Sequence, residues 1–372
     1  MKNKRILNLD PVLTIGFTLL FILGLLILTS ASMPMAEKTY NLPFYFFYNQ
    51  MACLCVGLVI LSVFLFIDTS SWQQLSTLML YIVLFLLLTV LLLGTEVNGA
   101  KRWLSLPGLN LQVSEILKLV LVLYLADFID NYYKEISVNL QILVVPLLWL
   151  LVAGCLLLAE PDFGATVVLV ITFMGMIFVA GISLRPLLLL GVLAVILLGG
   201  LAYFSPYRLA RLTTFLHPWD YAYSSGYQLT QALISYGRGD WLGLGLGGSI
   251  QKLFFLPEAH TDFIFSILAE ELGLFGAIFI IFLYLLVILR ILYYGVIGQK
   301  KDFIWQAFIC YGAAFYFMAQ SFISIGVNLG LLPTKGLTLP LMSYGRCSLL
   351  INCAFIGIVL RAIMEIKAPN RN

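Results

Sequence analysis

The sequence predicts an all-α integral membrane protein with ten transmembrane helices, and three observations support this fold class. Of the 372 residues, 62% are hydrophobic and only 10% are charged, and the mean hydropathy is +1.02. A soluble domain carries about 25% charged residues. The apolar runs are long and continuous, which favours helices over the short alternating strands of a membrane barrel. Because no soluble domain is appended, residues 1–372 are predicted to form a single membrane domain.

Ten hydrophobic segments are predicted to span the membrane. An even number of spans places both ends of the chain on one side. Lys and Arg concentrate in the loops on that side, so the positive-inside rule predicts cytoplasmic termini. Lys2, Lys4 and Arg5 mimic the start of a signal peptide, but the first apolar stretch is long enough to span and no convincing cleavage site follows it. The predicted spans are 12–32, 47–67, 76–94, 113–129, 141–158, 163–180, 185–204, 262–290, 303–327 and 339–363.

The longest connection, residues 205–260, is predicted to be a periplasmic loop between the seventh and eighth spans. Its segments YRLARLTTFLHPW and YQLTQALISYG carry apolar residues at helical spacing. Both are predicted to be amphipathic helices that lie along the membrane surface. Loops of this length within a compact protein are usually functional.

Charge and cysteine content exclude several classes of function. The net charge is only +3, which gives no indication of nucleic-acid binding. The six Cys residues lie mostly inside apolar runs, where Cys behaves as a small hydrophobic residue. Cys53 and Cys55 do not have the spacing of a metal site, and no His lies near them. Neither a disulfide framework nor a structural zinc is expected.

The remaining polar residues gather in the loops of the predicted outer side. Cations are not needed there for membrane orientation, so we expect an anionic ligand to bind at this side. The candidate residues are Lys101, Arg102, Glu115, Lys118, Arg208, Arg211, Glu258, His260, Asp262, Lys335 and Ser343.

Two pairs of these residues each allow a structural and a functional interpretation. Glu115 and Lys118 share one helix face at i and i+3, so they form either a structural ion pair or part of a binding site. Lys101 and Arg102 are either interfacial anchors beside a Trp or members of a cationic cluster.

Arg208 and Arg211 also share a helix face. They either snorkel onto lipid headgroups or capture a phosphate group, for which the guanidinium is well shaped. GLGLGG at 243–248 is weak as a nucleotide motif because no strand precedes it and no GK[ST] follows, but it is plausible as a flexible loop.

FLPEAHTDFIF, residues 255–265, places acids at the mouth of the eighth span. Asp262 or Thr261 is a candidate N-cap. Asp262, Ser266 and Glu270 follow one helix stripe, and at about 1.5 Å per residue Glu270 lies roughly 12 Å further into the bilayer. This span is therefore predicted to line a cavity that opens outward at Asp262, with Glu258 and His260 as its surroundings.

Four longer motifs resemble the SEDS membrane glycosyltransferases (shape, elongation, division and sporulation). The resemblance covers nearly the whole chain, and PEAHTDFIF and LPTKGLTLPL are closer to the division members than to the elongation members. One departure is Ser343-Tyr344-Gly345-Arg346-Cys347-Ser348, where the family usually has SYGGSS, which puts the local geometry in question. The motifs are NGAKRWLSLPGLNLQVSEILKL, AEPDFGATVVL, the segment from GYQLTQALISYG to LAEELGLFG, and GVNLGLLPTKGLTLPLMSYG.

The resemblance implies a ten-helix peptidoglycan polymerase in the bacterial inner membrane, with its active site facing the periplasm at the division septum. Its substrate would be lipid II, a disaccharide-pentapeptide on undecaprenyl pyrophosphate. Its partners would be a class B penicillin-binding protein and other division proteins. The family's essential acid corresponds to Asp262. Its substrate-cavity positions correspond to Glu115, Lys118, Arg208, Arg211 and Lys335.

Asp262 is therefore the candidate general base, and nearby cations would stabilise the leaving pyrophosphate. No tightly bound cofactor is expected. Catalysis without a metal is one alternative. The other is a divalent cation such as Mg²⁺ or Mn²⁺ that bridges Asp262 or the pyrophosphate, although the sequence shows no dedicated metal site. A lipid II flippase and a division scaffold are the competing functions. The concentration of charge on one side and the lack of visible inverted repeats disfavour transport, and scaffolding alone leaves the outward-facing acid and its cations unexplained.

Overall fold

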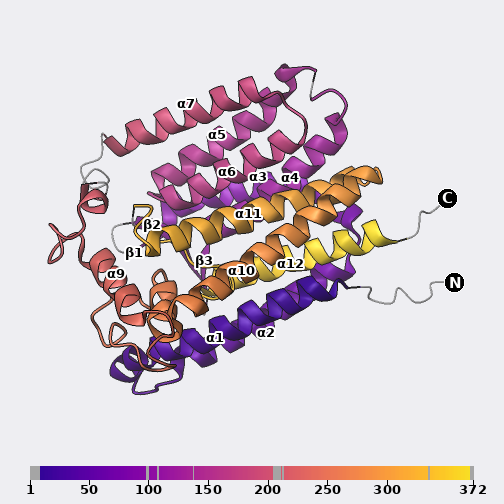
Figure 1. The fold of residues 1–372 in the computed structure, drawn as a ribbon. Coiled ribbons are helices and arrows are strands. Elements are labelled where there is room, and N and C mark those ends of the chain that lie inside the picture. Colours follow the sequence, from indigo (N-terminus) through magenta and orange to yellow (C-terminus); the bar gives the residue numbers. More distant parts are fainter. Residues whose placement is uncertain are drawn as a thin grey trace.

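The structure is a computed structural model that describes residues 9–97, 100–106, 109–136, 138–203, 211, 213–333 and 336–368. It is a bundle of long helices with a small sheet and a short helix at one end (Figure 1). The elements are α1 (Pro11–Tyr40), α2 (Tyr45–Phe66), α3 (Thr69–Leu93), β1 (Thr95–Val97), β2 (Ala100–Leu106), β3 (Leu109–Gln112), α4 (Val113–Tyr132), η1 (Leu140–Leu143), α5 (Val144–Ala159), α6 (Phe163–Val179), α7 (Leu184–Tyr203), α9 (Tyr227–Gly239), α10 (Ile264–Lys300), α11 (Ile304–Asn328) and α12 (Arg346–Lys367).

Seven helical segments among the described residues are long and apolar enough to cross a membrane: α1, α2, α3, the η1–α5 unit, α10, α11 and α12. The helices α4, α6 and α7 overlap the other three predicted spans. Charged residues such as Glu115 and Asp127 lower the hydropathy of α4, and α6 is short, with 17 residues. The predicted segments are thus helical, and the multi-pass character of the chain is clear.

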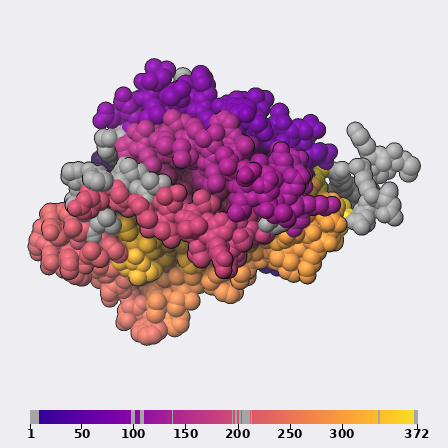
Figure 2. Space-filling view, turned by 90° about the horizontal axis from the view of Figure 1, so that it is seen from above, coloured from indigo at the N-terminus to yellow at the C-terminus, as the bar shows by residue number. Residues whose placement is uncertain are grey.

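The core lies where α4, α10, α11 and α12 pack together. Buried aromatic side chains such as Phe317 and Phe355 fill it, and Tyr316 stacks on Phe355 with ring centroids 4.3 Å apart. Seen from above, the magenta segments from the middle of the chain lie between purple helices on one side and orange C-terminal helices on the other (Figure 2). The outer faces of α2, α3 and α5 expose many large apolar side chains, as expected for surfaces in contact with lipid.

The first and last helices meet at one end of the bundle. Asp10 caps α1 by accepting a hydrogen bond from the amide of Leu13 at 3.0 Å. The same carboxylate binds Arg290 of α10 at 2.8 Å and lies 3.6 Å from Lys367 at the end of α12. The start of α1 therefore lies beside the end of α12, away from the sheet and α9 (Figure 1).

The expectation of a purely helical protein is wrong at residues 95–112, which form an antiparallel sheet in the order β1-β2-β3. Leu104 pairs with Leu111 in the register of β2 and β3. Asn-Gly and Pro-Gly pairs between the short apolar runs were the sequence signal for hairpins. Cys347 fixes the sheet to the start of α12, since its Sγ accepts from the Gln112 amide at 3.3 Å and donates to the Asn110 carbonyl at 3.0 Å.

The helix α10 is broken at Gly273, whose φ of +69° is outside the helical range. A Cβ at this position would lie 2.3 Å from the Gly243 amide nitrogen and 2.6 Å from the Trp241 carbonyl oxygen, so the chain has room only for glycine there. The part after the break, 274–300, has a length of about 40 Å at 1.5 Å per residue, which alone exceeds a hydrocarbon core of about 30 Å.

The connection 205–260 contains α9 within one of the segments predicted to be helical. Its apolar face is covered by protein: Leu229 and Ala232 are buried, and α9 packs against α10 and α11. In the other predicted surface helix, 207–219, residues 207–210 and 212 lie outside the described residues, and 211 and 213–216 are helical. The last span begins later than predicted, because residues 339–345 form turns and α12 starts at Arg346.

Candidate active site around Asp262

Asp262 lies just before α10, and an asparagine of another helix fixes its backbone. Asn328, at the end of α11, donates from Nδ2 to the Asp262 carbonyl at 2.8 Å. Its Oδ1 accepts from the amide and the hydroxyl of Ser266 at 3.2 and 2.9 Å. The predicted cap is wrong, because Phe263 takes the N-cap position and no side chain bonds there. Thr261 instead donates to the Glu258 carboxylate at 2.7 Å.

The Asp262 carboxyl is half-buried and faces Gly336, where a Cβ would come within 2.8 Å of Oδ2. Burial raises the pKa of Asp262 to about 7. The neighbouring Glu258 carboxylate adds to the rise, and the cationic Arg102 and Arg211 oppose it. The structure therefore brings together an acid and two arginines that are distant in the sequence. A carboxyl with a pKa near 7 is suited to act as a general base at neutral pH.

Arg102 connects the sheet to the loop between α5 and α6. Its guanidinium donates to the carbonyls of Glu160 and Pro161, at 3.3 and 2.5 Å. Burial raises the pKa of Glu160 to about 8, with Asp162 adding to the rise and Arg102 opposing it. The neighbouring Lys101 is exposed on β2. Arg102 is thus held in place by backbone contacts.

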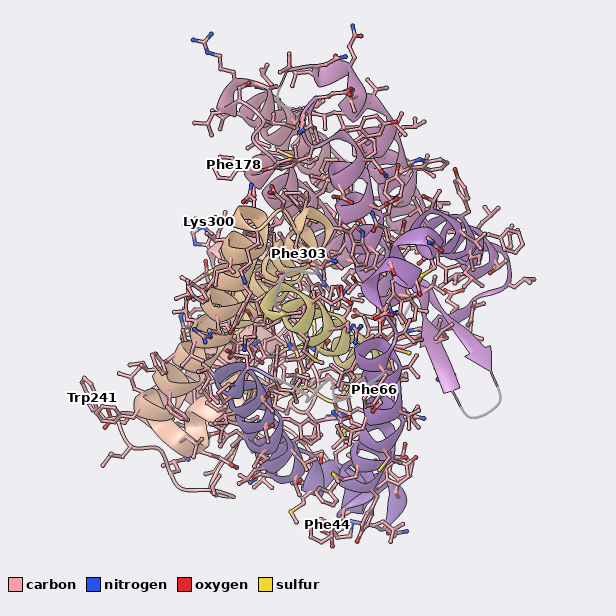
Figure 3. All side chains as sticks on the ribbon, turned by 90° about the vertical axis from the view of Figure 1, so that its right-hand side faces the viewer. Phe44, Phe66, Phe178, Trp241, Lys300 and Phe303 are labelled. Carbon is pink, nitrogen blue, oxygen red and sulfur yellow. The ribbon has the colours of Figure 1, made fainter. Side chains whose placement is uncertain are left out.

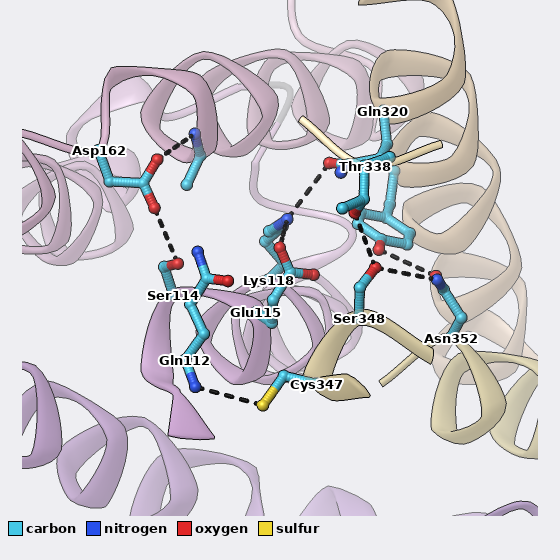
Figure 4. A network of polar contacts seen from close by, with 12 residues as sticks. Gln112, Ser114, Glu115, Lys118, Asp162, Gln320, Thr338, Cys347, Ser348 and Asn352 are labelled. Atoms are coloured by element: carbon cyan, nitrogen blue, oxygen red, sulfur yellow. Dashed lines mark hydrogen bonds and ion pairs between the residues drawn. The ribbon is translucent and has the colours of Figure 1, made fainter. Parts of the chain in front are cut away.

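The predicted ion pair of Glu115 and Lys118 forms, with Lys118 Nζ 2.6 Å from Glu115 Oε1 and both side chains buried. Lys118 also donates to Gln320 of α11 at 3.2 Å, and Gln320 donates to the Thr338 carbonyl at 3.1 Å (Figure 4). Thr338 continues the chain of contacts to Ser348 at 3.1 Å. These contacts connect the pair to the segment after Gly336. Glu115 Oε2 has no hydrogen-bond partner among the described residues.

Two further predicted site residues, His260 and Ser343, stabilise the structure around the site. The buried His260 ring packs 4.6 Å from Phe46 and 5.9 Å from Tyr344, and the Tyr344 amide donates to the His260 carbonyl at 3.0 Å. Burial lowers the pKa of His260, and the nearby Glu258 carboxylate opposes this shift. Ser343 Oγ accepts from the Leu339 amide at 2.8 Å and so stabilises the turn before α12. Whether either residue binds substrate stays a prediction.

The predicted stripe of Asp262, Ser266 and Glu270 does not line one cavity. Asp262 precedes the helix, and Ser266 is bonded to Asn328. Glu270 is fully buried and accepts hydrogen bonds from Arg238 and from the 249–251 segment of the long connection. Glu270 stands before the break of α10 at Gly273, and its depth in the bilayer stays a prediction. It holds the long connection in place.

Two predicted site residues, Arg208 and Lys335, lie outside the described residues. Sequence reasoning did not single out Asn328, Gln320 or Glu160, all of which the structure connects to the site. Asn328 and Gln320 are buried polar side chains inside an apolar helix, a sequence signal that marks functional or structural polar contacts in membrane proteins.

The described residues contain no group of three or more His, Cys, Asp and Glu side chains arranged to hold a metal ion. A cation at Asp262 would need to take its other ligands from Glu258, substrate oxygens and water. Mg²⁺ often binds in this way, through one or two carboxylates and substrate phosphates. The residues present therefore fit a substrate-bridging cation better than a resident one.

Comparison with known proteins finds relatives that share the same description. A probable peptidoglycan glycosyltransferase FtsW from Coxiella burnetii is 46% identical over 349 residues, which cover 93% of this chain and 94% of the relative. A protein with the same description from Alcanivorax borkumensis is 46% identical over 383 residues, covering 100% of this chain and 99% of the relative.

Solved structures agree with these relatives. A structure described as "Structural coordination of polymerization and crosslinking by a peptidoglycan synthase complex" is similar with a TM-score of 0.80 and 28% identity, covering 97% of this chain and 99% of the other. The crystal structure of the rod shape determining protein RodA of Thermus thermophilus matches with a TM-score of 0.72 and 26% identity, covering 98% and 100%. The family model for FtsW, RodA and SpoVE, described as "Cell cycle protein", matches residues 11–368. The chain therefore belongs to the FtsW/RodA/SpoVE family of cell cycle proteins.

Proposed function

We propose that this protein is a peptidoglycan glycosyltransferase that joins the disaccharide-pentapeptide units of lipid II into glycan strands at the division septum. The relatives described as probable peptidoglycan glycosyltransferases, at 43–46% identity over most of the chain, support the reaction. The observation that carries the proposal is the environment of Asp262. Its carboxyl is half-buried, its pKa is raised, and the charges of Arg102 and Arg211 act on it.

In the proposed step, the Asp262 carboxylate removes the proton from the 4-hydroxyl of the acceptor N-acetylglucosamine. The resulting oxygen nucleophile forms a bond to C1 of the donor sugar while the bond from C1 to the pyrophosphate oxygen breaks. The pyrophosphate leaves on its polyprenyl chain with the electron pair of that bond. Arg102 and Arg211 supply positive charge near Asp262. This positive charge stabilises the negative charge that develops on the leaving pyrophosphate.

A divalent cation, when bound, would neutralise part of the charge on the leaving pyrophosphate. Asp262 and Glu258 are the carboxylates that would hold it. The buried Glu115–Lys118 pair belongs to the substrate cavity in this proposal, because Gln320 and Thr338 connect it to the segment that begins at Gly336.

We place the protein in the bacterial inner membrane with ten spans, cytoplasmic termini and a periplasmic Asp262. The contact of Asp10 with Lys367 supports an even number of spans, because it brings the two ends of the helical bundle together. A class B penicillin-binding protein is the proposed partner, since one similar structure is a peptidoglycan synthase complex that coordinates polymerization and crosslinking.

The test is polymerisation of purified lipid II by the full chain with and without the class B penicillin-binding protein. We expect Asp262→Asn to lose activity by a factor of about 10² to 10⁴, the usual range for a general base. Asp220→Asn, which changes an exposed acid of the same long connection, is the matched control and should retain activity. A folded Asp262→Asn protein that makes strands of normal length at the normal rate would refute the assignment.

A further inference from the structure

A cavity of about 310 Å³ lies at the break of α10. Its walls come from α9, from both parts of α10 and from the end of α11. Most lining residues are apolar, among them Phe265 and Ala269 before the break and Leu274, Ala277 and Ile278 after it. A volume of this size is at the lower end of small-ligand pockets, which range from about 300 to 1,000 Å³. The walls suit an apolar ligand.

The cavity is open on the side of α10 that faces lipid. Leu274 and Ile278 line the cavity and are also 42% and 52% exposed, and the adjacent Phe275 is 59% exposed. Trp241, at the rim, is 59% exposed and projects from the edge of the molecule (Figure 3). Its ring lies 6.0 Å from the Phe275 ring. Tryptophan is enriched where a protein meets the membrane interface. A hydrocarbon chain in the bilayer can therefore enter from the side.

Two of the lining residues follow residues of the candidate active site closely in the sequence. Phe265 is three residues after Asp262, and the lining residue Leu329 directly follows Asn328, whose side chain holds the Asp262 backbone. A chain in the cavity would thus lead from the lipid side of α10 toward the junction that carries the proposed base.

The cavity wall also holds a buried polar group, the hydroxyl of Tyr236. It lies beside the Ser266 hydroxyl, which donates to Asn328 Oδ1 at 2.9 Å and can accept from Tyr236. A tyrosine oxygen that donates in this way can still accept one hydrogen bond from a polar group on a ligand. The site therefore suits a ligand with a long apolar chain and a polar end.

Glycosyl transfer between lipid-linked sugars requires two such ligands at once, because donor and acceptor each arrive on a polyprenyl pyrophosphate. We propose that the cavity between α9, α10 and α11 binds the polyprenyl chain of one of these two substrates. This inference rests on the proposed function and assigns a substrate subsite to it. The break at Gly273 is the feature that creates the subsite, since it turns the first part of α10 away from the spanning part.

The first experiment is photolabelling of the full-length protein in lipid nanodiscs with a diazirine-bearing polyprenyl pyrophosphate. We expect adducts on peptides that contain Trp241 or Ile278, and unlabelled polyprenyl pyrophosphate should compete with them. Adducts confined to other helices would overturn the proposal. Equal labelling of this cavity by a diazirine-bearing phospholipid, without competition by polyprenyl pyrophosphate, would also overturn it and identify a structural lipid site.

The second experiment fills the cavity with Ala277→Phe. The matched control is Leu289→Phe, an enlargement on the same helix at a 59% exposed position that does not line the cavity. The KM for lipid II with its full-length chain should rise about tenfold in Ala277→Phe, within the range for steric changes in an apolar pocket. The KM for an analogue with a short prenyl chain should not change. Equal behaviour of the two variants would contradict the proposal.

The two proposals fail in different ways. Asp262→Asn should abolish polymerisation and keep the photolabelling, because it removes the base and leaves the cavity intact. If Asp262→Asn polymerises normally, the proposed base is wrong, and the labelling result still decides the subsite.

Discussion

The clearest quantitative prediction concerns Glu270→Gln. Each carboxylate oxygen of Glu270 accepts two hydrogen bonds: Oε1 from Arg238 Nε at 3.0 Å and from the Ile250 amide at 3.2 Å, and Oε2 from the Ser249 hydroxyl and from the Gln251 amide at 3.3 Å. Glutamine is nearly isosteric, but its NH₂ group is a donor. In one orientation of the amide the NH₂ group faces the Ile250 amide, while the partly exposed Arg238 can turn to water. In the other it faces the Gln251 amide, while the Ser249 hydroxyl can rotate to accept from it. One backbone donor therefore loses its acceptor in either orientation.

A buried donor left without an acceptor costs about 1–3 kcal/mol. We assign no stabilisation to the charge of Arg238, since that side chain is 39% exposed. One orphaned amide at the middle of that range gives about 2 kcal/mol, which raises the equilibrium for local opening of the long connection about 30-fold. The opening should not require unfolding of the bundle, because the affected donors other than Arg238 lie in 249–251.

The measurement is amide hydrogen exchange of residues 244–251, resolved by mass spectrometry. The amides of Leu244 and Gly245 donate to carbonyls of α10 at 3.0 Å and report the attachment of the loop directly. Glu37→Gln, at an exposed position, is the control. We expect about 30-fold faster exchange in Glu270→Gln. Exchange at the rate of the unchanged protein would show that Glu270 does not hold the loop.

Three other predictions concern the site and its framework. The base acts when deprotonated, and burial raises the pKa of Asp262 to about 7, so kcat/KM should fall as pH drops below about 7. Glu258→Gln should move the midpoint of this pH profile to lower pH, because the Glu258 carboxylate adds to the raised pKa of Asp262. An unchanged midpoint would contradict the influence of Glu258 on Asp262. Gly273→Ala should lower the Tm in detergent by several degrees, whereas Gly245→Ala, at a positive φ with open space around its Cβ, should lower it less; equal losses would discount the close backbone approach. His260→Phe should keep the aromatic packing and at least half of the polymerisation rate, and loss of activity in a protein of normal Tm would assign the imidazole a chemical role.

The local patterns that predicted the helices were reliable, because they depend on residue type and spacing. Long apolar runs predicted helical segments, seven of which, among the described residues, are long and apolar enough to cross a membrane. The spacing of Glu115 and Lys118 predicted an ion pair that the structure contains. The hairpins of 95–112 were missed, although Asn-Gly and Pro-Gly pairs were present, because the expectation of helices throughout a membrane domain outweighed the turn signal.

The interpretation of Glu270 failed for a different reason. The stripe assumed that Asp262, Ser266 and Glu270 lie on one helix face along a cavity. Asp262 instead precedes α10, and Glu270 is bonded to the long connection, which also packs against the break that follows at Gly273, where φ is positive. The sequence contains many glycines, and which of them interrupts a helix depends on the segment that packs against it. Here the backbone of Trp241 and Gly243 occupies the space that a side chain would need.

The sequence by itself determined that this is a multi-pass membrane protein, that its polar chemistry lies in a few loops, and that Asp262 is the residue to test. These properties follow from hydropathy and from short motifs, which are local along the chain. Only the tertiary structure decided that Arg102 and Arg211 act on Asp262, that Asn328 fixes its backbone, and that an apolar cavity lies at the break of α10. Electrostatic influence, burial and cavities depend on distances between segments far apart in sequence, and only the packing of the helices fixes those distances.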